Sequence, residues 1–253
     1  MSRTCFDEAD LSSLPNPPLP VAHGAGRGRP LAMHVVVAGG HGRVARRLGK
    51  LLTARGDSVI GIVRSSQHEI DLTADGMESV VMDLDRTPVD ELASVIVVAD
   101  AVVFAAGAPP ENTAQRKGVV DRAASLRLAD AAAAASVRPF LLMSAMGVEA
   151  VAEGRIPPGA DGAYLNYLRA KWATEEGVRA RPAVDMMVVR PGRLTDDPGT
   201  GRVTVGRHVP RGTVPRDDVA ALLVALLDDP RPGAVLEVVS GTTPIDEAVA
   251  DLL

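Results

Sequence analysis

The sequence has little cysteine, few aromatic residues and no grouped histidines. One cysteine among 253 residues cannot form a disulfide within the chain, so a disulfide-stapled extracellular scaffold is excluded. Aromatic residues make up only 2% of the chain, and aliphatic side chains must therefore fill its core. The five histidines are scattered without the spacing of a zinc site, so we expect no bound metal.

The chain also lacks an excess of basic charge and any long apolar run. Its 27 basic and 32 acidic residues give a formal net charge of −5, which disfavours nucleic acid or an anionic membrane as a partner. Acidic residues stand near the N-terminus where a signal peptide needs basic ones, and no apolar stretch is long enough to cross a bilayer. We expect a cytoplasmic monomer or homodimer that acts on a small-molecule substrate.

Residues 1–32 differ in composition from the remainder of the chain. They are rich in proline and glycine and show no periodicity, so they cannot bury enough apolar surface to offset chain entropy. We expect a disordered tail here. The PxxP spacing at residues 17–20 suggests a peptide ligand instead, which is the less favoured interpretation.

From residue 33 to residue 253, short apolar runs alternate with helical patterns. Strands are predicted at residues 35–38, 58–63, 80–82, 101–105, 140–143, 185–189 and 235–239. Helices are predicted at residues 44–54, 90–97, 114–135, 162–180, 216–227 and 245–252. This alternation predicts one α/β domain, a doubly wound parallel sheet of the Rossmann type with a small C-terminal substrate section. Ligands of such sheets bind at the carboxyl ends of the strands.

A glycine-rich turn joins the first predicted strand to the first helix. Its residues are Gly39, Gly40, His41, Gly42, Arg43, Val44 and Ala45. Gly39 allows a tight turn, Gly42 lets the backbone approach a pyrophosphate, and Ala45 keeps helix and sheet close. The helix N-terminus adds free N–H groups and the positive end of its dipole. We expect these residues to bind a dinucleotide; the alternative is an ordinary strand-to-helix turn.

The end of the second strand indicates which dinucleotide is bound. An NAD site usually has an acidic residue there for the ribose hydroxyls, but this sequence has Arg64, Ser65 and Ser66. Arginine can pair with a 2′-phosphate, and the serines can donate hydrogen bonds to it. We therefore expect NADP rather than NAD, although Arg64 would also be ordinary as a surface arginine.

Two further loops carry weaker cofactor signals. Asp83 and Leu84 end the third strand, where the adenine edge of a dinucleotide would lie. Small residues end the fourth strand and would let a cofactor lie against the backbone: Ala105, Ala106 and Gly107.

The catalytic candidates are Ser144, Tyr167 and Lys171. Tyr167 and Lys171 have i, i+4 spacing and share a helix face, where a lysine cation favours the phenolate and lowers the tyrosine pKa. Such a tyrosine can give or accept a proton. Ser144 follows the fifth strand and could orient a substrate carbonyl. A solvent-facing pair and a strand-end cap are the alternatives, and Tyr164 is a competing aromatic.

These motifs together resemble those of the atypical short-chain dehydrogenases/reductases with an NAD(P)H-binding, NmrA-like Rossmann domain. Beyond the glycine turn, the matching residues are 142–145, 167–171, Glu175, 189–194, 203–205 and 215–220. The resemblance implies that Pro191 and Leu194 lie near the nicotinamide and that Lys171 reaches the nicotinamide ribose. It implies no particular substrate.

The leading functional hypothesis is an NADP(H)-dependent oxidoreductase acting on a small carbonyl or unsaturated compound. One alternative is an NADP(H)-binding redox sensor without turnover, which would need neither Tyr167 nor Lys171. Another is a relative of the nucleotide-sugar epimerases, disfavoured by the short stretch that follows Arg190.

The composition of residues 1–32 makes the tail dispensable. A chain that starts at Met33 should keep the melting temperature and cofactor affinity of the full chain. Thermal denaturation and a cofactor titration of both forms check this. A large loss of either property would mean that the tail packs on the domain.

Overall fold

The structure, a computed structural model, describes residues 32–107, 114–157 and 159–252, so most of the predicted tail lies outside the described residues. The strands are β1 (His34–Ala38), β2 (Ser58–Val63), β3 (Glu78–Val81), β4 (Ala101–Phe104), β5 (Pro139–Met143), β6 (Asp185–Pro191), β7 (Arg193–Thr195), β8 (Arg202–Gly206), β9 (Thr213–Pro215), β10 (Val235–Ser240) and β11 (Thr243–Pro244). The helices are α1 (Arg43–Ala54), the 3-10 helix η1 (Ser66–His68), α2 (Glu69–Ala74), α3 (Val89–Ile96), α4 (Ala114–Ala134), α5 (Val148–Ala152), α6 (Gly162–Arg179), α7 (Arg216–Asp228) and α8 (Ile245–Ala250).

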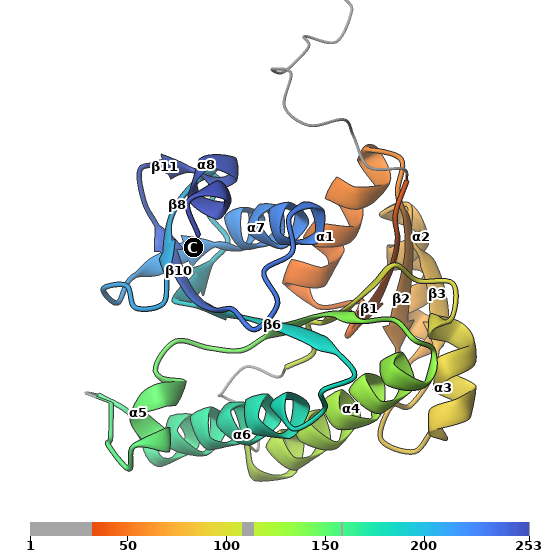
Figure 1. Cartoon of the computed structure of the whole chain (residues 1–253), viewed down its shortest axis with the longest axis horizontal. Coiled ribbons are helices and arrows are strands. Elements are labelled where there is room, and N and C mark those ends of the chain that lie inside the picture. The colour runs from red at the N-terminus through yellow and green to blue at the C-terminus, as the bar shows by residue number, and fades with distance from the viewer. Residues whose placement is uncertain (1–31, 108–113, 158, 253) are drawn as a thin grey trace, which may run out of the picture. The chain divides into compact units, whose positions relative to one another are not determined.

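The main sheet has nine strands in the order β11-β8-β10-β6-β5-β4-β1-β2-β3 (Figure 1). The seven strands from β10 to β3 pair in parallel, and β8 pairs antiparallel with both β10 and β11. The strand order reverses at β1, with β2 on one side and β4 on the other. This order confirms the predicted doubly wound parallel sheet, and its switch point lies between β1 and β4.

Helices cover both faces of this sheet. Figure 1 shows α1, α7 and α8 on one face and α3, α4 and α6 on the other. The alternation of β1 explains the two cores, because Val35 and Val37 pack with α1 and α7 while Val36 and Ala38 pack with α3 and α4. Strands buried on both faces read as the continuous apolar runs on which the strand predictions depend.

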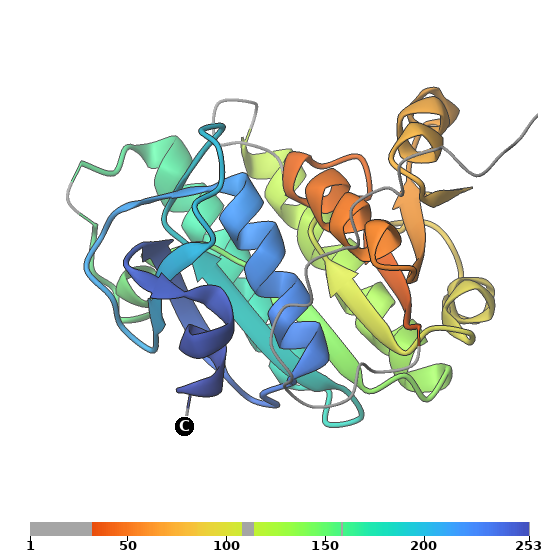
Figure 2. The same ribbon diagram turned by 90° about the horizontal axis from the view of Figure 1, so that it is seen from above.

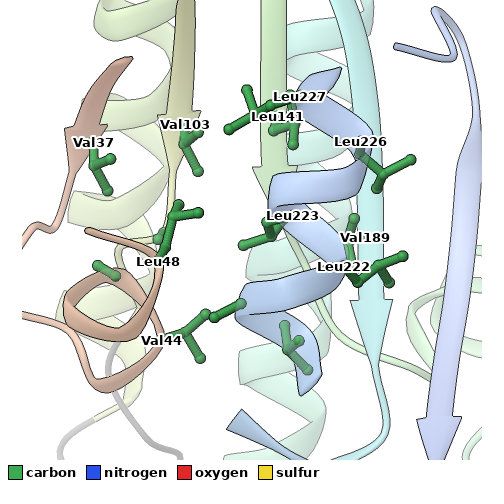
Figure 3. Close-up of a cluster of buried hydrophobic side chains, with 14 of the residues drawn as sticks. Val37, Val44, Leu48, Val103, Leu141, Val189, Leu222, Leu223, Leu226 and Leu227 are labelled. Atoms are coloured by element: carbon green, nitrogen blue, oxygen red, sulfur yellow. The ribbon is translucent and has the colours of Figure 1, made fainter. Parts of the chain in front are cut away.

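Aliphatic side chains fill the core between the sheet and the α1–α7 pair, which run side by side (Figure 2). Figure 3 shows Val44 and Leu48 of α1 near Val37 and Val103, while the leucines of α7 lie over Leu141 and Val189. These side chains are almost completely buried. Full burial of each such side chain contributes about 1.5–3 kcal/mol to the free energy of folding. Aliphatic side chains can therefore stabilise this face of the sheet without aromatic rings.

Small residues bring α4 and α6 close together on the opposite face. Ala129 and Ala132 of α4 are fully buried beneath Phe104 and Phe140 of the sheet. A Cβ at Gly177 of α6 would lie 2.5 Å from a methyl carbon of Leu126, so a larger residue there would require the Leu126 side chain to move. The alanine-rich stretch therefore has a packing role, and α6 is held in a fixed position against α4.

The chain after β6 mostly enlarges the main sheet, and the short strands β7 and β9 form a separate parallel pair. The strands β7, β8, β9 and β11 were not predicted, because they are short and partly exposed and lack a continuous apolar run. No helix in the described ranges is both long enough and apolar enough to span a membrane.

The first turn of α7 holds the loop before β8 through Asp218. Its nearly inaccessible carboxylate accepts hydrogen bonds from the N–H groups of Thr200 and Gly201, both at 2.8 Å, and from the Thr200 hydroxyl at 3.0 Å. Asp217, its neighbour, is about half exposed and pairs with Arg47 at 2.6 Å.

We expect Asp218→Asn to lower the free energy of unfolding by about 2–3 kcal/mol, because an amide group would face several donors and the charge would be lost. Urea denaturation measures the change. Asp217→Asn is the matched control and should cost less than about 1 kcal/mol, since its ion pair is exposed. Equal small losses would contradict this account of Asp218.

Candidate functional site

The glycine turn fits tightly between the ends of β2 and β4. The N–H groups of Gly39 and Gly40 donate to the Ile62 carbonyl at 3.2 and 3.1 Å. Gly39 has φ of +76°, and a Cβ there would lie 2.7 Å from Cα of Ala106. A Cβ at Gly40 would lie 2.8 Å from Cα of Gly61. Both glycines are therefore required by space, and Gly39 also by conformation.

The N-terminus of α1 opens at this turn without a side-chain cap. Gly42 is the N-cap residue, and the first helical turn contains no acidic side chain. The N–H of Gly42 donates to the Gly39 carbonyl at 2.8 Å, which closes the turn. The N–H groups of Arg43, Val44 and the next residue have no partner within the helix and carry the positive end of its dipole. This arrangement fits a phosphate group.

Three arginines surround one carboxylate beside this helix terminus. Asp196, in the loop after β7, lies 2.7 Å from Arg43, 2.9 Å from Arg216 and 3.5 Å from Arg47. Arg47 also pairs with Asp217. The three guanidinium groups exceed the two carboxylates by one positive charge, which favours an anion at the turn. Sequence reasoning missed Asp196 and Arg216, because the chain separates them widely from Arg43.

His41 connects the glycine turn to the segment that follows β2. Its ring stacks on that of His68 with centroids 3.8 Å apart, and its Nε2 lies 2.7 Å from Oδ2 of Asp71. The hydrogen bond with His41 is the main cause that holds the pKa of Asp71 below its usual value. The glycine turn therefore lies next to η1 and α2. Arg64 comes shortly before η1 in the chain.

The residues predicted to recognise a 2′-phosphate lie directly after β2. Arg64 is exposed and makes no salt bridge with any residue in the described part of the chain. The Ser65 hydroxyl oxygen accepts from the N–H of Gln67 at 3.3 Å and so caps η1. Its hydroxyl hydrogen remains suited to donate to an anion, as does that of the exposed Ser66.

Lys171 joins the carboxyl ends of β4 and β5. Its Nζ donates to the carbonyl oxygen of Met143 at 2.9 Å and to that of Ala106 at 3.3 Å. The residue is only 6% exposed, which is unusual for lysine. A Cβ at Gly107 would lie 3.1 Å from Nζ, so the small residues after β4, beginning with the buried Ala105, leave space for the ammonium group.

Ser144 and Tyr167 lie beside this lysine. The Tyr167 ring centroid is 6.0 Å from Nζ of Lys171, and the Tyr164 ring is 6.0 Å from that of Tyr167. Ser144 directly follows β5 and is 3% exposed, and its Oγ has no hydrogen-bond partner among the described residues. A buried hydroxyl without a partner costs about 1–3 kcal/mol, so such groups are exceptional and call for a ligand or water.

The other predicted positions have contacts of their own. Leu84 is buried in the α3–α4 core, and Asp83 organises its loop by accepting from the N–H of Asp85 at 3.2 Å. Pro191 ends β6 and its carbonyl accepts from the N–H of Met146, while Leu194 lies in β7 against the α1–α7 core. Leu84 lies in the turn after β3, and its side chain faces the core.

A buried ion pair fixes α6 against β6. Arg190 of β6 donates to Glu175 of α6 through Nε at 3.0 Å and Nη2 at 2.6 Å, and to Glu149 of α5 through Nη1 at 2.7 Å. Burial opposes the charge of Arg190, but the bonds with Glu175 and Glu149 outweigh burial and raise its pKa. This contact fixes the helix that carries Tyr167 and Lys171.

Known proteins share both the sequence pattern and the fold. The profile of the NAD(P)H-binding family matches residues 39–230. The uncharacterized sugar epimerase YhfK of Bacillus subtilis is 29% identical over 222 residues, which cover 87% of this chain and 100% of YhfK. A putative NAD-dependent epimerase/dehydratase from Bacillus halodurans has a TM-score of 0.77 at 29% identity, covering 87% of this chain and 100% of its own.

The oxidoreductase ylbE from Lactococcus lactis is also similar, with a TM-score of 0.73 at 25% identity over 86% of this chain and 95% of its own. The family profile alone spans well over half of the sequence. The chain therefore belongs to the NAD(P)H-binding family and has the fold of the NmrA-like atypical short-chain dehydrogenases/reductases.

Proposed function

We propose that this chain is an NADP(H)-dependent oxidoreductase that acts on a small carbonyl or unsaturated compound. The observation that carries the proposal is the position of Lys171, buried against the ends of β4 and β5 with Tyr167 and the unpartnered Ser144 hydroxyl beside it. A protein that only binds cofactor needs neither the tyrosine nor the lysine.

The residues around the glycine turn fit a dinucleotide. The uncapped start of α1 and the arginines around Asp196 would hold the pyrophosphate, and the close approach of Gly39 to Ala106 keeps this surface free of side chains. Arg64 and Ser65 would hold a 2′-phosphate, which favours NADP. When bound, the cofactor supplies or accepts a hydride.

The protein groups handle the proton and the substrate. A cation beside a phenol stabilises its ionised form, so Lys171 suits Tyr167 to give or accept a proton at its phenol oxygen. The Ser144 hydroxyl would orient a substrate carbonyl by donating to its oxygen, since it has no protein partner among the described residues.

The names of two relatives favour a second candidate, an epimerase acting on a sugar. An epimerase returns its cofactor to the starting redox state in each turnover, whereas the proposed reductase consumes NADPH. A redox sensor is the third candidate and would bind cofactor without turnover. A net change in nicotinamide absorbance with a carbonyl compound identifies the reductase. Conversion of a nucleotide sugar into its epimer without such a change identifies the epimerase, and cofactor binding without any conversion identifies the sensor.

We expect Gly42→Val to abolish cofactor binding while the circular dichroism spectrum stays α/β. A Cβ there would lie 3.1 Å from the Gly39 carbonyl oxygen and would disturb the turn at the phosphate. Fluorescence titration with NADPH measures binding. Gly162→Val is the control, because nothing lies within 4 Å of a Cβ there and its φ is not positive. Unchanged affinity in Gly42→Val would move the cofactor site elsewhere.

Arg64→Ala should weaken NADPH binding about ten- to a hundredfold and hardly affect NADH, because a charge-assisted phosphate contact is worth about 1.5–3 kcal/mol. Calorimetric titrations with both cofactors test this. Arg138→Ala, an exposed arginine at the amino end of β5, should change neither affinity. Equal affinity of the wild-type chain for NADPH and NADH would refute the NADP assignment.

Tyr167→Phe should lower kcat by about 10²–10⁴ and leave cofactor affinity unchanged, since the phenol serves only proton transfer. Lys171→Ala should lower both kcat and cofactor affinity, because Lys171 is assigned to the cofactor ribose and to Tyr167. Tyr164→Phe, one turn earlier on α6, is the matched control and should keep kcat. Full activity of Tyr167→Phe on a confirmed substrate would assign the proton to another donor.

A further inference from the structure

A second cluster of chemically active side chains lies beside the Arg190 ion pair. Glu149 of α5, His208 after β8 and Glu237 of β10 each place one potential ligand atom within 4.8 Å of the other two. The three residues come from separate elements, so their spacing in the sequence has none of the regularity of a metal motif. They take no part in the oxidoreductase chemistry proposed above.

The carboxylates of this cluster are unequally paired with cations. Arg190 donates to both Glu175 and Glu149, and Glu237 is its register partner on β10. Glu237 is only 7% exposed, and among the described residues it forms no salt bridge with an arginine or lysine. Glu149 and Glu175 thus share the guanidinium of Arg190, and Arg179 lies a further 3.9 Å from Glu175. Burying an unbalanced carboxylate is costly, and a cation among these groups would remove that cost.

The ligand atoms are held in place by other contacts. Arg190 binds Oε1 of Glu149, while Oε2 of the same carboxylate lies 3.3 Å from Nδ1 of His208. The N–H of Val209 donates to Oε2 of Glu237 at 3.0 Å and fixes the residue next to His208 against β10. Such supporting contacts orient ligands at protein metal sites.

The spacing and chemistry of these groups fit a transition metal. Ligands about 2.0–2.1 Å from a tetrahedral ion lie roughly 3.3–3.4 Å apart. The separation of His208 and Glu149 matches this value, and the whole group of three ligand atoms lies within 4.8 Å. One imidazole with two carboxylates suits zinc or manganese better than calcium or magnesium. The His208 side chain is 74% exposed, so one side of the cluster is open to water or to an oxygen of a substrate.

We propose that Glu149, His208 and Glu237 form a binding site for one divalent transition metal ion of the zinc or manganese type. Glu149 stands in the connection that follows Ser144, and Arg190 links it to the helix that carries Tyr167 and Lys171. The proposal does not depend on which reaction the chain catalyses.

The test uses the full chain, freed of metal with a chelator and titrated calorimetrically with ZnCl₂ and with MnCl₂, without cofactor or substrate. We expect one ion per chain for the wild-type protein. His208→Ala and Glu237→Gln should each weaken binding at least tenfold. His34→Ala replaces another exposed histidine, at the start of β1, and should bind like wild type.

His208→Ala removes an exposed side chain and should leave the fold intact, so its result stands even if Glu237→Gln unfolds. Absorption of the Co²⁺-loaded chain gives a second readout, because the visible bands of a four- or five-coordinate ion should disappear in His208→Ala. Absence of saturable binding by the wild-type chain, or equal binding by wild type and His208→Ala, would overturn the proposal. Equal binding would mean that His208 and Glu149 form an ordinary ion pair and not part of a metal site.

Discussion

The interaction on which the candidate site depends is the pair of hydrogen bonds from Lys171 to the carbonyl oxygens of Met143 and Ala106. An ammonium group so far from water is tolerated only when polar partners replace its hydration. Those partners are backbone atoms at the ends of two adjacent parallel strands. Lys171 therefore holds α6 over the carboxyl edge of the sheet, and with it Tyr167.

Two further contacts keep this edge rigid. The ion pair between Arg190 and Glu175 fixes α6 to β6 from within the core. On the other side of the switch point, the close approach of Gly39 to Ala106 brings the ends of β1 and β4 together without an intervening side chain. The result is a surface of backbone groups at the ends of the central strands, bordered by the start of α1 and by Lys171. Such a preorganised edge suits a dinucleotide.

The sequence predicts those parts of this arrangement that depend on local patterns. Continuous apolar runs identify β1, β2, β4, β5 and β6, because strands buried on both faces are mostly apolar. The glycine turn can also be recognised in the sequence, because glycine is needed wherever a side chain would collide with the neighbouring backbone. Leu84 shows the limit of this reasoning, because it lies in the turn after β3 and its side chain packs in the core.

Contacts between distant parts of the chain could not be predicted. The grouping of Arg43, Arg216 and Asp196 depends on how β7 and α7 approach α1, which no local pattern encodes. The same holds for Glu149, His208 and Glu237, which the strand order brings together. Histidines that appear scattered in the sequence can therefore still meet carboxylates in space.

Amide hydrogen exchange of the full chain with and without NADPH tests the central claim most directly. The claim is that the carboxyl ends of β1, β4 and β5, the last two joined by Lys171, bind the cofactor. It predicts slower exchange on NADPH addition in the glycine turn and the first turn of α1, in the loop after β2, and around Ala106 and Ser144. Protection confined to other segments, or no protection at saturating NADPH, would contradict the account.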